Sequence, residues 1–184
     1  LAMPQTTQSE ILHFWFTELT PQQHFIKDAA LDESIRTRFG PTLDAAARCE
    51  LFPWRATPEG RLAEILVLDQ FSRNVYRDTA RAFAQDALAL ALAQELVASG
   101  QDRNLPTAQR VFAYMPYMHS ESALIHEQAL ELFAQPGMEN NLDFERRHKA
   151  IIDRFGRYPH RNAILGRTST PEELAFLSEP GSSF

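Results

Sequence analysis

Apolar residues recur every three or four positions along most of the chain, with polar residues between them. This spacing is typical of amphipathic helices, whereas a half-buried strand would show strict alternation of apolar and polar residues. No segment combines such alternation with the turn residues expected between strands. The pattern therefore predicts an all-α protein.

Capping residues predict where several helices begin. Thr7 with Glu10, and Thr170 with Glu173, have the spacing of a capping box. Thr57 precedes Pro58, and proline is accepted in the first turn of a helix. With Gly and Pro taken as terminators, we expect helices near residues 7–19, 28–39, 41–49, 57–76, 79–99, 106–114, 121–134, 141–155 and from 170 onward.

Three of these boundaries depend on single residues. Gly40 is expected to end one helix before Pro41 begins the next. Pro116 is expected to break another helix. Ser120 is expected to cap the helix that follows this break.

Short turns join the segments, and no Pro-, Gly- or Ser-rich linker separates them. We therefore expect one α-helical domain over residues 1–184. The Ala-rich run 82–98 would let neighbouring helices approach closely, as in stacked helix pairs. No 34-residue repeat is evident, so we predict an irregular helical-pair array of eight or nine helices.

Composition is that of an ordinary globular domain, with 44% hydrophobic and 23% charged residues. Cys49 is the single cysteine, so no internal disulfide is expected and a cytoplasmic location is favoured. No apolar run approaches the roughly 20 residues of a membrane span. Residues 1–9 lack a basic start and an apolar core, so we expect no signal peptide and a natural start at Met3.

Charge is unevenly distributed along the chain. The net charge of −6 disfavours a nucleic-acid binder, because phosphate binding depends on clustered Lys and Arg. Residues 146–167 contain seven basic residues and one acid, a balance of +6, which leaves −12 for the rest. A solvated basic helix face and a local anion site both remain open as interpretations.

A first polar motif lies on the expected helix 57–76. Charged and apolar side chains share one helical stripe there: Leu62, Leu66, Asp69, Arg73 and Tyr76. Its other sides are also mostly apolar, which indicates a buried helix. We therefore expect Asp69 to be buried and paired with Arg73, four positions on. The candidate residues are Asp69, Gln70, Arg73 and Asn74, either as a structural knot or as donors into a cavity.

A second motif is the run 114–121, Tyr-Met-Pro-Tyr-Met-His-Ser-Glu. It sets His119 immediately before the expected helix start at Ser120, and helix N-termini favour anions. Glu121 either satisfies the helix dipole or orients His119 as a base. His119 and Glu121 are therefore candidate ligand-binding residues, with simple capping as the alternative.

A third motif is the run 154–162, in which Gly156 and Pro159 constrain a basic turn. Its cationic or titratable side chains are Arg154, Arg157, His160 and Arg161. Arg157, His160 and Arg161 join the candidate ligand-binding residues, because guanidinium groups suit carboxylate and phosphate.

No cofactor or metal is expected. The spacing Glu145-x-x-His148 matches one element of a carboxylate di-iron site, but no second copy exists. A glycine-rich phosphate loop, a dinucleotide fingerprint and a cysteine cluster are also missing from the sequence.

Three long motifs, in order, carry a resemblance to a known family. They are Leu-Asp-Gln-Phe-Ser-Arg-Asn-Val-Tyr-Arg at 68–77, the run 114–121, and Arg-Phe-Gly-Arg-Tyr-Pro-His-Arg-Asn at 154–162 with its continuation to 173. The chain resembles the mainly bacterial family catalogued as domain of unknown function nine-two-four over nearly its whole length. The resemblance implies a tetratricopeptide-like helical fold and no established activity or cofactor.

Three functional hypotheses follow. The first is a binding protein whose polar pocket, lined by Arg73, His119, Arg157, His160 and Arg161, takes an anionic small molecule or a peptide carboxylate. The second is an enzyme acting on such a ligand, with His119 and Glu121 or His160 as acid and base. The third is a purely structural or oligomeric role. A homodimer would follow if an aromatic ring of residues 14–16 joined a larger surface patch.

Overall fold

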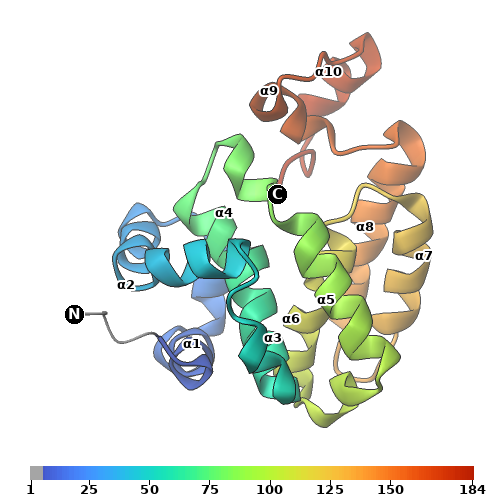
Figure 1. The fold of residues 1–184 in the computed structure, drawn as a ribbon. Helices are drawn as coiled ribbons and strands as arrows, with labels where there is room; N and C mark the ends of the chain where they lie inside the picture. Colours follow the sequence, from blue (N-terminus) through green and yellow to red (C-terminus); the bar gives the residue numbers. More distant parts are fainter. Residues whose placement is uncertain (1–5) are drawn as a thin grey trace. The chain divides into compact units, whose positions relative to one another are not determined.

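The computed structural model describes residues 6–184, and these residues are helical or irregular with no strand (Figure 1). The all-α prediction is therefore confirmed. The expected start at Met3 lies outside the described residues. The chain folds into two compact units, which we call unit 1 (Leu1–Arg77 with Arg81–Pro116) and unit 2 (Asp78–Ala80 with Tyr117–Phe184). The single domain expected over 1–184 stays a prediction.

Unit 1 is built from six α-helices joined by short 3-10 and π-helical segments. The α-helices are α1 (Gln8–His13), α2 (Ala29–Ala47), α3 (Pro58–Leu66), α4 (Ser72–Val75), α5 (Asp86–Ala98) and α6 (Thr107–Met118), whose last two residues belong to unit 2. The 3-10 segments are Pro21–His24, Phe52–Ala56, Ala80–Phe83 and Gln101–Asn104. The π-helical segments are Phe14–Glu18 and Val67–Phe71.

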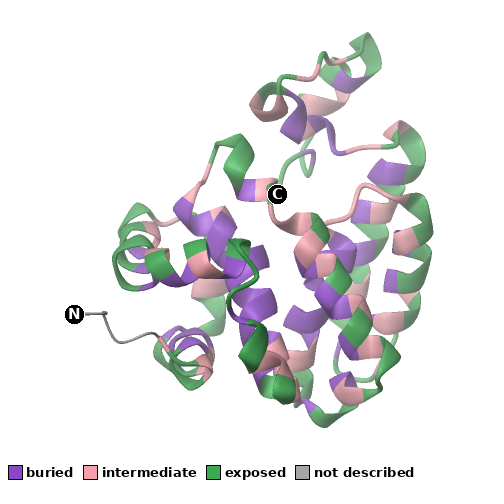
Figure 2. Ribbon diagram, in the orientation of Figure 1, coloured by how far each residue is buried: buried purple, intermediate pink, exposed green. Residues whose placement is uncertain are grey.

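A continuous helix from α3 through the π-helical segment to α4 forms the centre of unit 1. Thr57 caps its start by accepting a hydrogen bond from the Gly60 N–H, and Pro58 occupies the first turn, as expected. Every residue from Leu62 to Phe71 is buried, and the middle of this helix is purple in Figure 2. Gly60 is required by packing, because a Cβ there would lie 1.9 Å from the Trp54 carbonyl oxygen.

Aromatic rings pack around this helix. Phe14 lies edge-on to Phe39 at 5.0 Å, and Phe39 stacks on Phe71 at 5.3 Å. Trp15 is fully buried and lies edge-on to Phe112. Phe16, the third ring of the 14–16 triplet, is half-buried, so this triplet supplies no fully exposed ring.

Two expected helix breaks are absent. α2 runs from Ala29 to Ala47 through Gly40 and Pro41, so one helix replaces the two expected there. Gly40 does not adopt the positive φ that ends helices at other glycines of this chain. α6 likewise continues through Pro116. A proline removes only one backbone donor, and tertiary packing can hold the remaining turns in place.

Unit 2 contains α7 (Ala123–Leu132), α8 (Glu139–Phe155), α9 (Asn162–Leu165) and α10 (Pro171–Leu177), with a 3-10 turn at Pro159–Arg161. The cap of α7 is Ser122 and not Ser120, whose hydroxyl instead accepts from the Ser122 N–H. Gly156 ends α8 in the left-handed region at φ 72°, as expected. With α3 and α4 counted as one continuous helix, the ten labelled helices give nine, within the predicted eight or nine.

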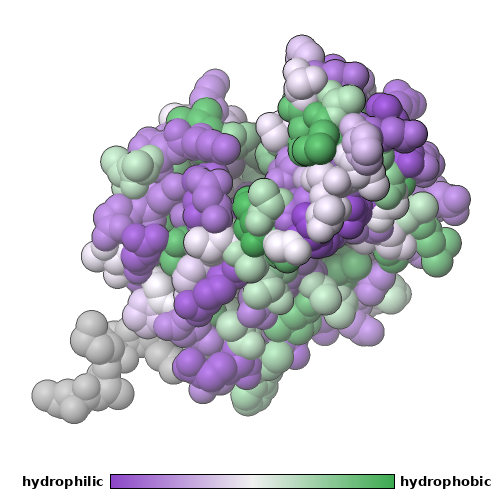
Figure 3. Space-filling model, turned by 90° about the horizontal axis from the view of Figure 1, so that it is seen from above, coloured by the Kyte–Doolittle hydropathy of each residue, from purple (hydrophilic) through white to green (hydrophobic). Residues whose placement is uncertain are grey.

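Within residues 6–184, no helix is both long and apolar enough to cross a membrane. On the face drawn in Figure 3, hydrophobic side chains form several separate patches among hydrophilic ones. Large exposed apolar residues occur in both units, for example the neighbours Phe25 and Ile26 in unit 1 and Leu174 in unit 2.

Candidate functional site

The first polar motif forms a charged knot inside unit 1. Asp69 is 1% exposed and lies in the π-helical segment. Its carboxylate accepts from the Gln70 amide at 3.1 Å and from Arg73 Nη1 at 3.4 Å. Arg73 also donates twice to Asp86, at 2.8 and 3.0 Å. The burial and pairing expected for Asp69 are therefore present, and Asp86 is a partner that the local spacing did not predict.

Asn74, the fourth residue of this motif, faces a different carboxylate. Its amide donates to Asp32 Oδ1 at 2.9 Å, and Arg77 donates to both oxygens of Asp32. Burial by itself raises the pKa of Asp32, but hydrogen bonds from Arg77 and Asn74 lower it below its ordinary value. These contacts tie α4 to the first turn of α2.

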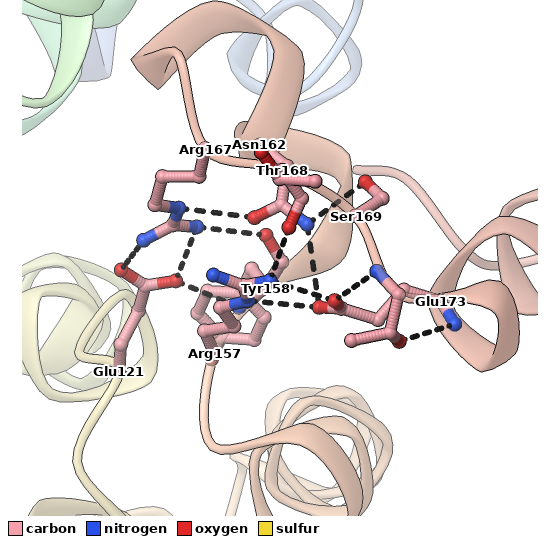
Figure 4. Close-up of polar contacts among 9 residues, drawn as sticks. Glu121, Arg157, Tyr158, Asn162, Arg167, Thr168, Ser169 and Glu173 are labelled. Atoms are coloured by element: carbon pink, nitrogen blue, oxygen red, sulfur yellow. Dashed lines mark hydrogen bonds and ion pairs between the residues drawn. The ribbon is translucent and has the colours of Figure 1, made fainter.

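The second and third motifs meet in unit 2 (Figure 4). Arg167 donates to both oxygens of Glu121, at 2.9 and 3.0 Å, and the Tyr158 backbone N–H donates to Glu121 at 2.7 Å. Burial alone would raise the pKa of Glu121, but the hydrogen bonds from Arg167 and Tyr158 lower it. Glu121 is therefore an ionised anchor for the turn, and it precedes α7 instead of lying in its first turn.

Arg157 forms the other ion pair of this turn. It donates to both oxygens of Glu173 at 2.9 and 2.7 Å, and Glu173 also accepts from the Thr170 N–H and the Asn162 amide. The hydrogen bond from Arg157 is the main reason why the pKa of Glu173 falls to about 2. The capping box expected at Thr170 and Glu173 is complete, and the capping carboxylate has this second role.

His119, His160 and Arg161 lie next to these pairs. Arg161 is 5% exposed and donates from Nη2 to the His119 carbonyl at 3.0 Å. Its guanidinium carbon also lies 4.8 Å from the centroid of the Tyr158 ring. His119 and His160 are half-buried. The fold thus brings residues 119 and 161 together across 42 positions of sequence.

Beneath this turn lies a buried chain of hydrogen bonds that the motifs did not reveal. Tyr158 donates its hydroxyl proton to the Met118 carbonyl at 2.6 Å. His126 Nε2 lies 2.6 Å from the Ser120 carbonyl and 2.9 Å from the Tyr158 hydroxyl, so it carries a hydrogen and donates. His126 Nδ1 lies 2.6 Å from Glu145 Oε2, and one further proton is shared between them. Burial raises the pKa of Glu145.

His148, whose spacing from Glu145 suggested only part of a metal pattern, belongs to the same region. Burial lowers its pKa to about 3, so it is neutral at physiological pH. Its Nδ1 donates to the Phe144 carbonyl at 2.7 Å. Among the described residues, no group of three or more His, Cys, Asp or Glu is placed to hold a metal ion.

The nine predicted site residues therefore divide between the units. Unit 1 holds Asp69, Gln70, Arg73 and Asn74, and unit 2 holds His119, Glu121, Arg157, His160 and Arg161. One pocket lined by Arg73 together with the unit 2 residues stays a prediction.

Sequence reasoning missed several members of the unit 2 site: His126, Glu145, Tyr158, Arg167 and Glu173. An aromatic residue between Gly156 and Pro159 in a basic segment was a usable sequence signal for Tyr158. The partners of Glu145 and Glu121 are 19 and 46 positions away, so no local pattern could find them.

Comparisons with known proteins give the family and no activity. Among curated proteins, nothing matches this chain. The chain is similar to the solved structure of a protein of unknown function from Agrobacterium tumefaciens, with 40% sequence identity and a TM-score of 0.89. That match covers 93% of this chain and 96% of the other. The family model for a bacterial protein of unknown function, DUF924, matches residues 11–181, and the chain therefore belongs to this family.

Proposed function

We propose that the protein binds an anionic ligand, a small molecule or a peptide carboxylate, through unit 2. The observation that carries the proposal is the meeting of two motifs: Arg161 of the basic turn donates to the His119 carbonyl at 3.0 Å. This contact brings the polar residues 119–121 to the segment whose local charge is +6. A cationic turn held in a fixed conformation suits recognition of carboxylate or phosphate.

The contacts indicate two different roles for the basic residues of unit 2. Arg157 and Arg167 are bound in two-point pairs by Glu173 and Glu121, so we assign them to holding the turn. His119, His160 and Arg161, which lie next to these pairs, are the residues proposed to contact the ligand. Glu121 is ionised at neutral pH because its pKa is lowered, which makes it a poor proton donor in the enzyme alternative.

One specific observation favours the structural alternative. The internal carboxylates Glu121 and Glu173 already neutralise two guanidinium groups of the turn, so these pairs stabilise unit 2 without any ligand. In that case the turn would serve only to join α8, α9 and α10. The two functions differ in whether an external anion stabilises the protein.

The proposal also includes a cytoplasmic location and a tetratricopeptide-like array as the scaffold. The single Cys49 is compatible with a reducing compartment. Arrays of helical pairs commonly present concave surfaces for recognition, which supports a binding role.

Thermal unfolding in the presence of phosphate, sulfate, acetate and citrate tests the proposal. A ligand at about 100 times its Kd stabilises the folded state by about 2.7 kcal/mol, so a saturable rise in Tm is expected with at least one anion. His160→Gln should remove this rise, because it deletes one proposed contact. Arg146→Gln should retain it, because Arg146 is an exposed cation on α8.

The control separates a site from general charge screening. Equal Tm shifts in wild type, His160→Gln and Arg146→Gln would show that the anions act on the whole surface. The absence of a saturable shift with all four anions would favour the structural alternative.

A further inference from the structure

The residues after α10 place one aromatic ring against the site. We call residues 178–184 the tail. Its Ser182 is buried and donates to the Leu177 carbonyl at 3.1 Å, and Gly181 makes a turn at φ 79°, which glycine adopts without strain. The tail therefore follows a defined path that places the Phe184 ring.

The Phe184 ring packs against three rings of unit 2. Its centroid lies 3.9 Å from that of His148, 4.4 Å from that of His160 and 5.1 Å from that of Tyr158. The Tyr158 and His160 contacts are edge-to-face, an arrangement that aromatic pairs favour. His148, Tyr158 and His160 thus form a receptor for a planar ring, which we call the aromatic slot.

Phe184 fills the aromatic slot without being enclosed by it. Half of its surface, 50%, remains exposed to solvent, whereas Tyr158 below it is fully buried. A ring held on one side by three contacts is displaceable, because exposed tail residues contribute few other interactions. The slot itself persists when Phe184 leaves, since Tyr158 is anchored by its bonds to Met118 and Glu121.

The aromatic slot adjoins the cationic residues of the proposed site. His160 contacts Phe184 directly, and its neighbour Arg161 lies over the same Tyr158 ring that Phe184 touches. Residues 158–161 therefore supply both ring contacts and positive charge. A ligand that carries an aromatic ring close to a carboxylate would use both.

We propose that Phe184 occupies the aromatic half of the ligand site, and that the ligand is an aromatic carboxylate which displaces the tail. The carboxylate half rests on the proposed function, whereas the aromatic half rests on the ring contacts alone. Phe184 thus competes with external ligands for the slot. The apparent affinity of an external ligand is its intrinsic affinity multiplied by the fraction of time that Phe184 leaves the slot empty.

The test compares Phe184→Ala with Phe144→Ala as a matched control. Phe144 is 52% exposed and belongs to the same unit, and it meets the slot through its backbone carbonyl, which accepts from His148 and is kept in the alanine variant. The probes are N-acetyl-phenylalanine and the synthetic peptide of residues 178–184. NMR spectra of the histidine rings report where each probe binds, and titrations give its Kd.

We expect Phe184→Ala to shift the ring signals of His148 and His160 and to bind N-acetyl-phenylalanine about tenfold more tightly than wild type, as for a slot about nine tenths occupied. Phe144→Ala should match wild type. If the peptide binds more tightly than N-acetyl-phenylalanine, the slot is assigned to peptides. If the two probes bind equally, the slot is assigned to small acids. Either result supports an aromatic carboxylate as the ligand.

Two further probes separate this inference from the proposed function. N-acetyl-phenylalaninamide carries the ring without the carboxylate, and acetate carries the carboxylate without the ring. Equal binding of the amide and the acid to Phe184→Ala would support the slot and contradict the anion site. Binding of acetate as tightly as N-acetyl-phenylalanine, with no gain in Phe184→Ala, would overturn the slot and leave the anion site standing. No binding of either aromatic probe to Phe184→Ala would also overturn the slot.

Discussion

The charged knot of unit 1 and the ion pairs of the unit 2 turn hold their charges in different ways. In unit 1, Asp69 and Arg73 are four positions apart on one continuous helix, and Asp86 completes the knot. In unit 2, Arg157 and Glu173 are 16 positions apart, and the other pair joins residues separated by 46 positions. The first arrangement fixes a helix within a core, whereas the second fixes an irregular turn.

This difference bears on function. The unit 1 knot is surrounded by apolar residues of the central helix, and Asp69 is almost inaccessible. The arginines of the unit 2 pairs are more exposed, with 29% of the Arg157 side chain and 26% of the Arg167 side chain accessible against 19% for Arg73. They hold the turn that carries His160 and Arg161. Stability should therefore depend most on unit 1, and ligand binding should depend on unit 2.

The largest effect is expected in unit 1. Asp69→Ala should lower the free energy of unfolding by about 3 kcal/mol, the low end of the range for breaking a buried ion pair, because Arg73 keeps Asp86. Urea denaturation measures the loss. Asp153→Ala, which removes an exposed carboxylate paired with Lys149, should cost less than about 1 kcal/mol. A loss below about 1 kcal/mol for Asp69→Ala would mean that the knot is not a stabilising part of the core.

A smaller loss is expected for a unit 2 pair. Arg167→Gln removes two charged hydrogen bonds to Glu121 and should lower the free energy of unfolding by about 2 kcal/mol. Arg147→Gln, at an exposed pair with Asp143, should change it by less than about 0.5 kcal/mol. Indistinguishable denaturation curves for these two variants would remove the anchoring role assigned to Glu121.

The third effect is the smallest at neutral pH, and it concerns the titration of His148. Burial lowers the pKa of His148 from its ordinary 6.5 to about 3, and the nearby His119, His126 and His160 oppose a further positive charge. Between these two values the unfolded chain binds a proton that the folded protein excludes, so stability decreases as pH falls below about 6.5. The contribution approaches about 1.4 kcal/mol per pH unit.

Urea denaturation at pH 7, 6 and 5 measures this slope. His148→Gln should flatten it, because the variant lacks the buried titrating ring. Phe144→Gln on the same helix adds no titrating group and should keep the wild-type slope. Parallel curves for wild type and His148→Gln would show that His148 is not held neutral by the fold.

Helix ends were predictable from the sequence where a single capping residue or glycine determines them. Thr7, Thr57 and Thr170 cap helices as expected, and Gly100 and Gly156 lie at helix ends with positive φ. Three of the wrong boundaries involve residues whose local preference is overridden by packing or by another partner, and the helix expected from residue 79 begins only at Asp86. Helices α2 and α6 continue through a proline, and Ser122 takes the capping role expected of its neighbour two positions earlier.

The candidate site was predictable only in part, for a related reason. The pairing of Asp69 with Arg73 follows from helical spacing, because i and i+4 side chains face each other. No such rule connects Glu121 to Arg167 or His126 to Glu145, since these contacts form only when separate helices pack. The motifs identified the right segments, but the pairing of the chain's own carboxylates with these segments can be seen only in the three-dimensional structure.

Chemical-shift mapping by NMR tests the central claim most directly. Wild-type protein is titrated with phosphate and then with N-acetyl-phenylalanine, and amide and histidine signals are followed to saturation. The account predicts saturable shifts around His119, His160 and Arg161 of unit 2, with residues 69–74 of unit 1 unchanged. Saturable shifts centred on Arg73, or no saturable shift with either probe, would contradict it.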